Sequence, residues 1–200
     1  DFDRSASSSF QYGPDGCFDP DHDSNNGLEQ DWSSGSYLQT LYNNKYASFM
    51  SRADFWVAAA SGVIHHTSSG ALDLVDVFRF GRVDRDECPG SGGRLPTPAG
   101  CDEIEDVFLE RMGLTYKDAV ALMGGHTLGR GELSGHHGTW VENNREAQKF
   151  NKKYYEELFR SVWRPRKFGE GQQDWTTGQD DSDNSARVML NTDICMAFDI

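Results

Sequence analysis

The chain has 200 residues, a length that suits one domain or slightly more than one. It carries 32 acidic and 19 basic residues, and its formal charge of −13 argues against a nucleic-acid binder because a phosphate backbone would be repelled. The most apolar stretch covers only residues 55–64, whereas a membrane span needs about twenty residues, so we expect no span. Because 12% of the residues are aromatic, we expect an acidic globular domain.

The ends and the cysteines give two further expectations. The chain starts at Asp1 without a methionine and ends at Ile200 inside a predicted helix. Cys88 and Cys101 flank a loop rich in proline and glycine, and a disulfide that closes this loop is one expected pairing. Four cysteines without a Cys-x-x-Cys pair favour a secretory compartment.

The first half of the chain predicts loops and two helices. Residues 1–36 are rich in serine, glycine, aspartate and asparagine, and they predict a long loop region. Apolar spacing predicts a helix over residues 37–49. A second, buried helix is predicted from Ser51 to about His65, with a capping box at its start.

The second half is more clearly helical, and the fold class is therefore mainly α. Residues 78–84 predict a short strand or an extended turn, and residues 86–101 predict a loop that separates two subdomains. We expect helices that begin at Asp102, Thr115, about Phe150 and Thr192, and Thr115 with Asp118 predicts a capping box at the start of the second. The first of them should end at Gly113.

One histidine follows the apolar spacing of the helix that begins at Thr115. Ala119, Leu122, Met123 and His126 recur at helical spacing, which predicts one buried face that includes the imidazole. Two glycines precede His126 and remove side chains from the adjoining surface, so the imidazole could coordinate a metal beneath a large flat ligand. The alternative is a core histidine that a carbonyl or a carboxylate satisfies.

The segment Asp118–Gly129, DAVALMGGHTLG, closely resembles the proximal-histidine signature of the plant, fungal and bacterial haem peroxidase superfamily. Further segments resemble the family in the same order: Gly81–Asp84, Gly93–Pro96, Phe150–Tyr155 and Met189–Asp193. The pattern over residues 13–199 is most similar to the cytochrome c and ascorbate peroxidase class. The resemblance implies haem b between two helical halves, with residues 1–96 as the remainder of the distal half and residues 97–200 as the proximal half.

The resemblance also implies roles for three proximal residues. His126 matches the axial ligand of the haem iron, and Asp193 matches the aspartate that accepts its other ring N–H and so strengthens the imidazole as a donor. Asp193 could also stabilise a helix N-terminus near Thr192, alone or together with the first role. Trp140 resembles the proximal tryptophan, which can hold a radical in cytochrome c peroxidases but not in ascorbate peroxidases; simple packing is its alternative role.

On the distal side, Asn25 matches the asparagine whose amide oxygen would accept a proton from the distal histidine. Asn25 could equally be a turn residue, and Asn26 is a possible register slip. The Arg-x-x-x-His element of the distal site is absent from the sequence, and the family layout puts it before Asp1. The resemblance thus implies a fragment truncated at both ends, and we expect that this chain by itself is not a competent peroxidase.

Departures from the family pattern affect cations and the electron donor. Thr127 matches a cation-ligand threonine, which implies calcium or potassium, but the companion positions hold Val141 and the uncharged Asn151. Cys17 stands where the distal calcium loop of secreted members has a serine, and a thiol is a poor calcium ligand. Gly135 occupies the position of an arginine in ascorbate-specific enzymes, which argues against ascorbate specificity.

The leading functional hypothesis is a haem-dependent peroxidase that reduces hydrogen peroxide, oxidises a donor by one electron at a time and acts in the response to oxidative stress. The donor is a small molecule or a basic protein, which the acidic residues 180–183 could attract. One alternative is a non-catalytic secreted binding protein of the same fold. Another is a non-haem metal hydrolase that uses the pairs His65–His66 and His136–His137, although no carboxylate at helical spacing completes such a site.

Overall fold

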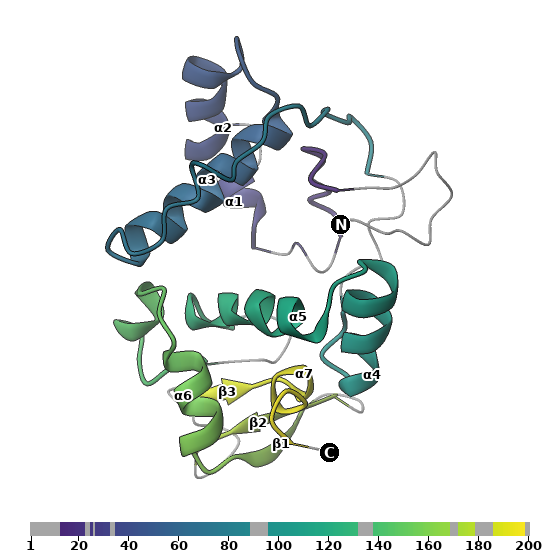
Figure 1. Cartoon of the computed structure of the whole chain (residues 1–200), viewed down its shortest axis with the longest axis vertical. Coiled ribbons are helices and arrows are strands. Elements are labelled where there is room, and N and C mark those ends of the chain that lie inside the picture. Colours follow the sequence, from purple (N-terminus) through teal and green to yellow (C-terminus); the bar gives the residue numbers. More distant parts are fainter. Residues whose placement is uncertain are drawn as a thin grey trace. The chain divides into compact units, whose positions relative to one another are not determined.

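The computed structural model describes residues 13–22, 25, 27–32, 35–88, 96–131, 138–168, 172–178 and 186–198 (Figure 1). The chain forms two compact units, Asp1–Leu95 and Pro96–Ile200, and helices dominate both, so the mainly α fold class is confirmed. Among the described residues, no helix is both long enough and apolar enough to cross a membrane.

The described part of the first unit contains three helices and one π-helical turn. They are α1 (Glu29–Trp32), α2 (Tyr37–Leu41), the π-helical turn η2 (Tyr42–Tyr46) and α3 (Arg52–Thr67). The predicted helix over residues 37–49 is confirmed in place, but it is shorter and ends in the π-helical turn. The Ser36 side chain caps α2 by accepting the backbone N–H of Gln39 at 3.2 Å.

The helix α3 starts with the predicted cap but without the predicted capping box. The Ser51 hydroxyl accepts the backbone N–H of Asp54 at 3.0 Å. The Asp54 carboxylate does not return to Ser51; it accepts the backbone N–H of Gly81 at 2.8 Å and the guanidinium of Arg82 at 2.8 Å. A distant loop therefore takes the place of the helix's own backbone as the partner of this buried carboxylate.

A second carboxylate joins the same loop to α3. Asp84 accepts the backbone N–H groups of Arg52 and Ala53, each at 2.8 Å, and so satisfies two donors that every helix N-terminus leaves free. Residues 79–85 form no strand, which makes the extended-turn alternative correct. The segment is extended because these carboxylates hold it against the helix.

The prediction that α3 is buried along its length is wrong. Only its first turn is buried, where Phe55 packs against the rings of Tyr42 and Tyr46 with centroids 5.3 Å apart in both cases. The later turns stay partly or fully exposed, and Val63 is among the exposed residues. Apolar composition alone therefore overstated the burial of this helix.

Each unit contains one disulfide. Cys17 pairs with Cys88 in the first unit, and Cys101 pairs with Cys195 in the second. The expected Cys88–Cys101 disulfide is wrong, because these two cysteines belong to different units and each finds its partner within its own unit. Neighbouring positions in the sequence could not reveal these long-range pairings, which span 71 and 94 residues.

Helices in the second unit surround a small antiparallel sheet. Its helical elements are α4 (Cys101–Glu103) with the π-helical η3 (Ile104–Arg111), α5 (Tyr116–Met123) with the 3₁₀ turn η4 (Gly124–Thr127), the 3₁₀ turn η5 (Glu146–Gln148), α6 (Lys153–Arg160) and α7 (Asn191–Ile194). Its strands are β1 (Arg164–Phe168), β2 (Gln172–Thr176) and β3 (Val188–Met189), in the order β1-β2-β3. The four helices expected here all exist, with shifted ends.

The predicted helix ends can be compared with the observed ones. Asp102 lies inside the first turn of α4, and Gly100 holds the cap position that was predicted for Asp102. Gly113 ends the helical stretch as predicted, with a left-handed φ of 72°. The capping box of α5 is confirmed, since Thr115 and Asp118 exchange side-chain and backbone hydrogen bonds.

The hairpin of β1 and β2 was not predicted. In its register Arg166 lies opposite Asp174, and the two buried side chains form a double ion pair at 2.8 and 2.7 Å. A buried arginine and a buried aspartate break the alternation of apolar and polar residues that announces a strand. The sequence therefore carried no usable signal for this hairpin.

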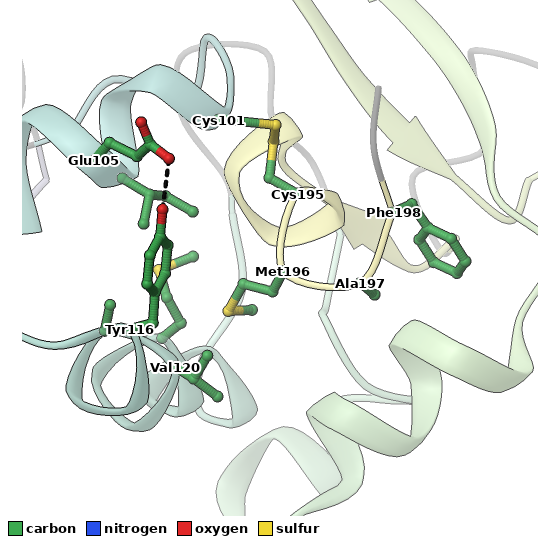
Figure 2. Close-up of a pocket in the computed structure, with 11 residues that line it drawn as sticks. Cys101, Glu105, Tyr116, Val120, Cys195, Met196, Ala197 and Phe198 are labelled. Atoms are coloured by element: carbon green, nitrogen blue, oxygen red, sulfur yellow. Dashed lines mark hydrogen bonds between the residues drawn. A yellow bond between two sulfur atoms is a disulfide. The ribbon is translucent and has the colours of Figure 1, made fainter.

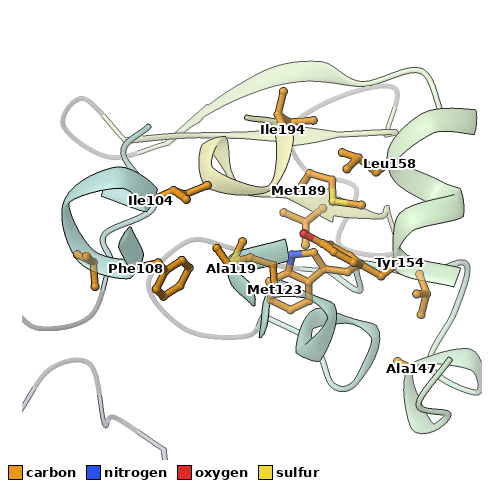
Figure 3. Close-up of a cluster of buried hydrophobic side chains, with 13 residues drawn as sticks. Ile104, Phe108, Ala119, Met123, Ala147, Tyr154, Leu158, Met189 and Ile194 are labelled. Atoms are coloured by element: carbon orange, nitrogen blue, oxygen red, sulfur yellow. The ribbon is translucent and has the colours of Figure 1, made fainter. Parts of the chain in front are cut away.

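The apolar core of the second unit joins its helices to the sheet (Figure 3). Buried side chains come from η3, α5, α6, β3 and α7, and they include Phe108, Met123, Leu158, Met189 and Ile194. Packing of this kind stabilises short helices that would not form alone. The core thus fixes the relative positions of α5, α6 and α7.

We expect Leu158→Ala to lower the free energy of unfolding by about 2–5 kcal/mol, because Leu158 is 1% exposed and truncation leaves a cavity. The matched control is Val162→Ala, which should change it by less than about 0.5 kcal/mol because Val162 is 88% exposed. Urea unfolding followed by circular dichroism measures both. Equal losses for the two variants would contradict this core.

The pH dependence of stability tests the Asp54 contact. Burial by itself raises the pKa of Asp54, but the hydrogen bonds from Gly81 and Arg82 outweigh it and lower the pKa below its ordinary value. A lowered pKa means that Asp54 stabilises the fold above its unfolded pKa of about 3.9 and loses that effect at lower pH. We expect the stability advantage over Asp54→Asn to shrink as the pH falls below about 4; a constant difference down to about pH 3 would refute this.

Candidate functional site

The imidazole of His126 lies on the 3₁₀ turn that follows α5. Ala119 and Met123 are buried as predicted, whereas Leu122 is 52% exposed and the His126 side chain is 31% exposed. The prediction of one shared buried face is therefore wrong for Leu122 and His126. The helix type changes at Gly124–Thr127, so the α-helical spacing no longer applies at the histidine.

Asp193 is the centre of the site, because its fully buried carboxylate accepts four hydrogen bonds. Oδ1 accepts from Nδ1 of His126 at 2.8 Å and from the hydroxyl of Tyr154 at 2.6 Å. Oδ2 accepts from Nε1 of Trp140 at 2.8 Å and from the backbone N–H of Leu190 at 2.7 Å. Since a carboxylate only accepts, Nδ1 carries the proton of this hydrogen bond, and in a neutral imidazole Nε2 would then keep its lone pair.

Ring contacts hold the imidazole in one orientation. His126 stacks on Trp140 with ring centroids 4.4 Å apart and an interplanar angle of 19°. Tyr154 meets the imidazole edge-on at 5.9 Å and 81°. Together with the hydrogen bond to Asp193, these contacts fix both the direction and the rotation of the ring.

Each of these side chains is positioned by a different element. Trp140 follows Thr139, which bridges to Arg187, and the N–H of Val188 in β3 donates to the Thr139 carbonyl at 2.9 Å. Tyr154 comes from α6 and Asp193 from α7. The structure therefore brings together His126, Asp193 and Trp140, the three residues that the resemblance assigned to the proximal side.

Tyr154 is the residue that the sequence reasoning missed. Burial raises the pKa of its phenol well above the ordinary value, and the charge of Asp193 raises it further. The hydroxyl therefore stays protonated and donates a hydrogen bond to the carboxylate. Tyr154 lies in the segment Phe150–Tyr155, whose resemblance to the family assigns no role to this tyrosine. A phenol in that segment was the available signal, since a buried hydroxyl needs a partner.

A glycine allows α6 to approach the histidine turn closely. A Cβ atom at Gly124 would lie 2.5 Å from the hydroxyl oxygen of Tyr155, which donates to the carbonyl of Val120. No side chain larger than hydrogen fits there without a shift. Gly124 thus permits the packing that places the turn with His126 beside α6.

The surroundings of the second imidazole nitrogen fit a flat apolar metal complex. The histidine is half-buried, and Ala121, Leu122 and Gly125 are exposed near it on α5 and the following turn. A Cβ at Gly125 would meet no atom within 4 Å, so this surface is open. A haem group matches this donor set, because its iron takes an imidazole nitrogen and its ring covers apolar side chains.

Asn25 belongs to the first unit. Its Nδ2 donates to the carbonyl of Asp19 at 2.8 Å, and its backbone N–H donates to the carbonyl of His22 at 2.8 Å. These bonds use the amide nitrogen in a turn, and within the described part of the chain Oδ1 has no protein donor. The turn role is therefore present, and the oxygen that the distal role requires stays available; Asn26 lies outside the described residues.

Thr127, the candidate cation ligand, is fully buried. Its hydroxyl lies 3.3 Å from Oδ1 of Asn151 and 3.4 Å from the carbonyl of Lys149, and it can donate to either. Val141 is buried nearby in the same core and offers no side-chain oxygen. Thr127 therefore has protein partners for its hydroxyl.

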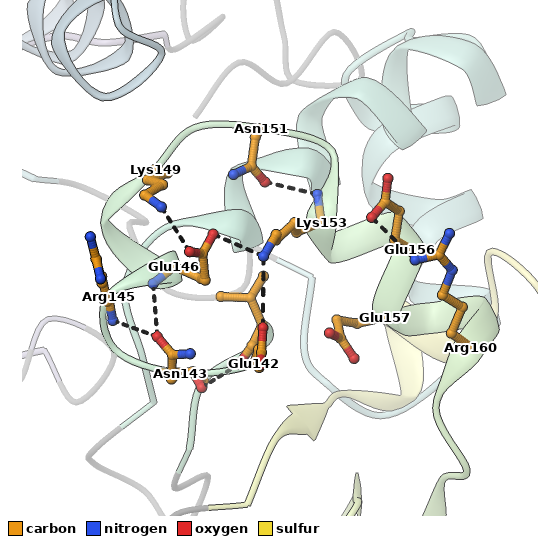
Figure 4. Close-up of polar contacts among 12 residues, drawn as sticks. Glu142, Asn143, Arg145, Glu146, Lys149, Asn151, Lys153, Glu156, Glu157 and Arg160 are labelled. Atoms are coloured by element: carbon orange, nitrogen blue, oxygen red, sulfur yellow. Dashed lines mark hydrogen bonds and ion pairs between the residues drawn. The ribbon is translucent and has the colours of Figure 1, made fainter.

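Ion pairs hold the segment that contains these partners (Figure 4). Glu146 contacts Nζ of Lys149 at 2.7 Å and Nζ of Lys153 at 3.0 Å, and Lys153 also lies 3.7 Å from Glu142. Hydrogen bonds from both lysines lower the pKa of Glu146. The Oδ1 of Asn151 accepts the backbone N–H of Lys153, which begins α6.

The remaining candidates do not form a site in the described part of the chain. His65 and His66 are exposed on α3, and His65 contacts the carbonyl of Leu72. The described residues contain no group of three or more histidine, cysteine, aspartate or glutamate side chains that could hold a metal ion. Cys17 is oxidised in its disulfide. Gly135, His136–His137 and residues 180–183 lie outside the described residues.

Comparisons with known proteins agree with this geometry. A family model described as Peroxidase matches residues 18–199. L-ascorbate peroxidase 2, cytosolic, of Arabidopsis thaliana is 39% identical over 140 residues, which cover 68% of this chain and 50% of that protein. A putative heme-binding peroxidase of Mycosarcoma maydis is 33% identical over 158 residues, which cover 76% of this chain and 46% of that protein.

This chain spans about half the length of these two relatives. The family match nevertheless covers nearly all of it, including the segments that carry His126, Trp140 and Asp193. The chain belongs to the peroxidase family, within the plant, fungal and bacterial haem peroxidases and in the class of the ascorbate peroxidases.

Proposed function

We propose that this chain supplies the proximal half of a haem b peroxidase site, with His126 as the axial ligand. The observation that carries the proposal is the hydrogen bond from Nδ1 of His126 to the buried Asp193 carboxylate. It commits one imidazole nitrogen to the protein and leaves the other for a ligand, and Leu122, one turn earlier in the chain, is an exposed apolar side chain. The family membership supports the same assignment.

Asp193 and its partners would set the strength of this ligand. A carboxylate that accepts the Nδ1 proton makes the imidazole a stronger electron donor at Nε2. When bound, haem would supply the redox chemistry that reduces hydrogen peroxide and oxidises a donor by one electron at a time. Trp140 and Tyr154 hold the carboxylate in place by donating to its two oxygens; a redox role for Trp140 stays a prediction.

The distal side of the proposal rests on Asn25. Its amide nitrogen is held by Asp19, which leaves the amide oxygen for a distal base. We assign the unit up to Leu95 to the distal half and the unit from Pro96 to the proximal half. A donor is not assigned: the plant relatives are named for ascorbate, whereas Gly135 argues against that substrate.

Haem is the only cofactor in this proposal. The Thr127 hydroxyl already has Asn151 and Lys149 as partners, so its geometry gives no support to calcium or potassium there. Two disulfides favour an oxidising compartment, since such bonds are rare in cytosolic proteins. Names such as cytosolic and peroxisomal describe the relatives alone.

Haem titration of the intact protein tests the axial ligand. We expect His126→Ala to weaken haem binding and shift the Soret band, and Asp193→Asn to weaken binding by about 10–100-fold through loss of the carboxylate charge. The control is His66→Ala, an exposed histidine on α3 that should behave like wild type. Unchanged haem binding in His126→Ala would refute the assignment. Normal binding without peroxide turnover by the intact protein would favour a non-catalytic binding protein.

Two neighbouring tyrosines test the carboxylate network. Tyr154→Phe removes a donor to buried Asp193 and should cost about 1.5–3 kcal/mol of unfolding free energy, because the lost bond is to a charged group. Tyr155→Phe removes only a bond to a backbone carbonyl and should cost about 0.5–1.5 kcal/mol. Urea unfolding measures both variants, and a larger loss for Tyr155→Phe would argue against the network.

A further inference from the structure

The helix that carries Asp193 is too short to hold itself in place. Helix α7 has only four residues, Asn191–Ile194, and a single helical turn is unstable without outside contacts. The Asp193 carboxylate can therefore keep its position only if α7 is tied to its surroundings. Ile194 in the apolar core holds the middle of α7, and further ties at its two ends restrict where the acceptor for His126 lies.

Two of these ties start from the first residue of α7. The Oδ1 of Asn191 accepts the indole N–H of Trp175 in β2 at 2.8 Å. The Nδ2 of Asn191 donates to the carbonyl of Ala99 at 2.9 Å. The start of α7 is thus joined both to the sheet and to the segment that leads into α4.

The third tie is covalent and lies at the other end. Cys195 directly follows α7, and its disulfide joins it to Cys101, the first residue of α4. Cys195 is two residues from Asp193, and its N–H closes the helical turn on the carbonyl of Asn191 at 3.0 Å. The hydrogen bond to Ala99 and the disulfide to Cys101 therefore clamp both ends of α7 to one short segment.

We propose that the Cys101–Cys195 disulfide is a positioning element for the Asp193 carboxylate, and that its reduction loosens the hydrogen bonds on His126 and Trp140. The consequence for a haem ligand rests on the proposed function. The effect on the hydrogen bonds themselves does not, because those contacts exist in the protein alone.

The disulfide is placed where a reductant can reach it. Cys101 and Cys195 are both half-buried and line a cavity of about 550 Å³, together with Tyr116, Met196 and Phe198 (Figure 2). A dithiol reductant would attack one sulfur, break the S–S bond and leave as a disulfide. Its two electrons and two protons end on the thiols of Cys101 and Cys195.

The second disulfide provides a matched control. Cys17–Cys88 lies in the other unit and closes a loop of similar size, 71 residues against 94. No residue of the Asp193 network belongs to that unit. A general loss of stability should follow removal of either bond, whereas a positional effect on Asp193 should follow removal of only one.

The first experiment uses the protein without haem and measures hydrogen exchange of the Trp140 indole N–H and of the Leu190 amide, the two N–H donors to Oδ2. We expect exchange to rise about tenfold or more in Cys101→Ser/Cys195→Ser and to stay at the wild-type rate in Cys17→Ser/Cys88→Ser. Equal exchange in both double variants overturns the proposal.

If Cys101→Ser/Cys195→Ser does not fold, the wild type is reduced with dithiothreitol and the new thiols are counted by alkylation. Exchange at Trp140 should rise in step with reduction of Cys101–Cys195 while the amides of α6 stay protected. Exchange at Trp140 that does not follow reduction, or loss of protection throughout the unit, overturns a local role.

The second experiment measures the reduction potential of bound haem iron. A loosened Asp193 makes His126 a weaker donor, so the double variant at Cys101 and Cys195 should shift the potential upward, and Asp193→Asn should shift it further in the same direction. A disulfide that only stabilises the fold would not move the potential, and such a result overturns the positioning role. If haem does not bind at all, the proposed function fails, while the exchange experiment still decides the role of the disulfide.

Discussion

The buried carboxylate of Asp193 is the constraint on which the second unit depends. An unpaired charge at this depth would cost several kcal/mol, so the fold must supply donors to both oxygens. Four donors come from four parts of the chain: His126, Trp140, Tyr154 and Leu190. The interactions that allow this charge to be buried are therefore the same ones that orient the imidazole.

Because Nδ1 of His126 donates to the carboxylate, only Nε2 of the imidazole remains for a ligand. The preceding helix α5 has exposed apolar residues, among them Leu122 at 52% exposure. Exposed apolar surface next to a fixed imidazole has no role in the core, and it suits contact with a large flat ligand. Helix α5 thus has two faces. The buried face, with Met123, stabilises the fold, and the exposed face is the one that our proposal assigns to the ligand.

The sequence predicted the parts of the protein that depend on local signals. The capping box at Thr115 and the helix end at Gly113 need only neighbouring residues, and the structure contains both. The family pattern brought His126, Trp140 and Asp193 to notice without showing how they meet. Their meeting depends on Tyr154 and on a short helix after β3, which are consequences of tertiary packing.

Predictions failed where distant residues decide the outcome. Asp54 looked like half of a capping box, yet the loop at Gly81 offers its carboxylate better donors than the helix start does. Cys88 and Cys101 are near neighbours in the sequence, but they do not pair with each other. Cys88 pairs with Cys17, 71 residues away, and Cys101 pairs with Cys195, 94 residues away. The hairpin of β1 and β2 could not be predicted from its sequence, because Arg166 and Asp174 occupy buried strand positions. Each charge can be buried there only because the other lies opposite to it.

The two roles considered for Asp193 are both present in one carboxylate. Its Oδ2 accepts the N–H of Leu190 at the start of α7, as a helix-stabilising side chain does, while Oδ1 accepts from His126. Replacing Asp193 therefore weakens α7 and the imidazole together, and stability alone cannot separate the two effects. A change at Cys195, outside the carboxylate network, alters the position of α7 with every donor and acceptor intact. His126 then experiences only a change in the position of the Asp193 carboxylate, and not a change in the groups that donate or accept its hydrogen bonds.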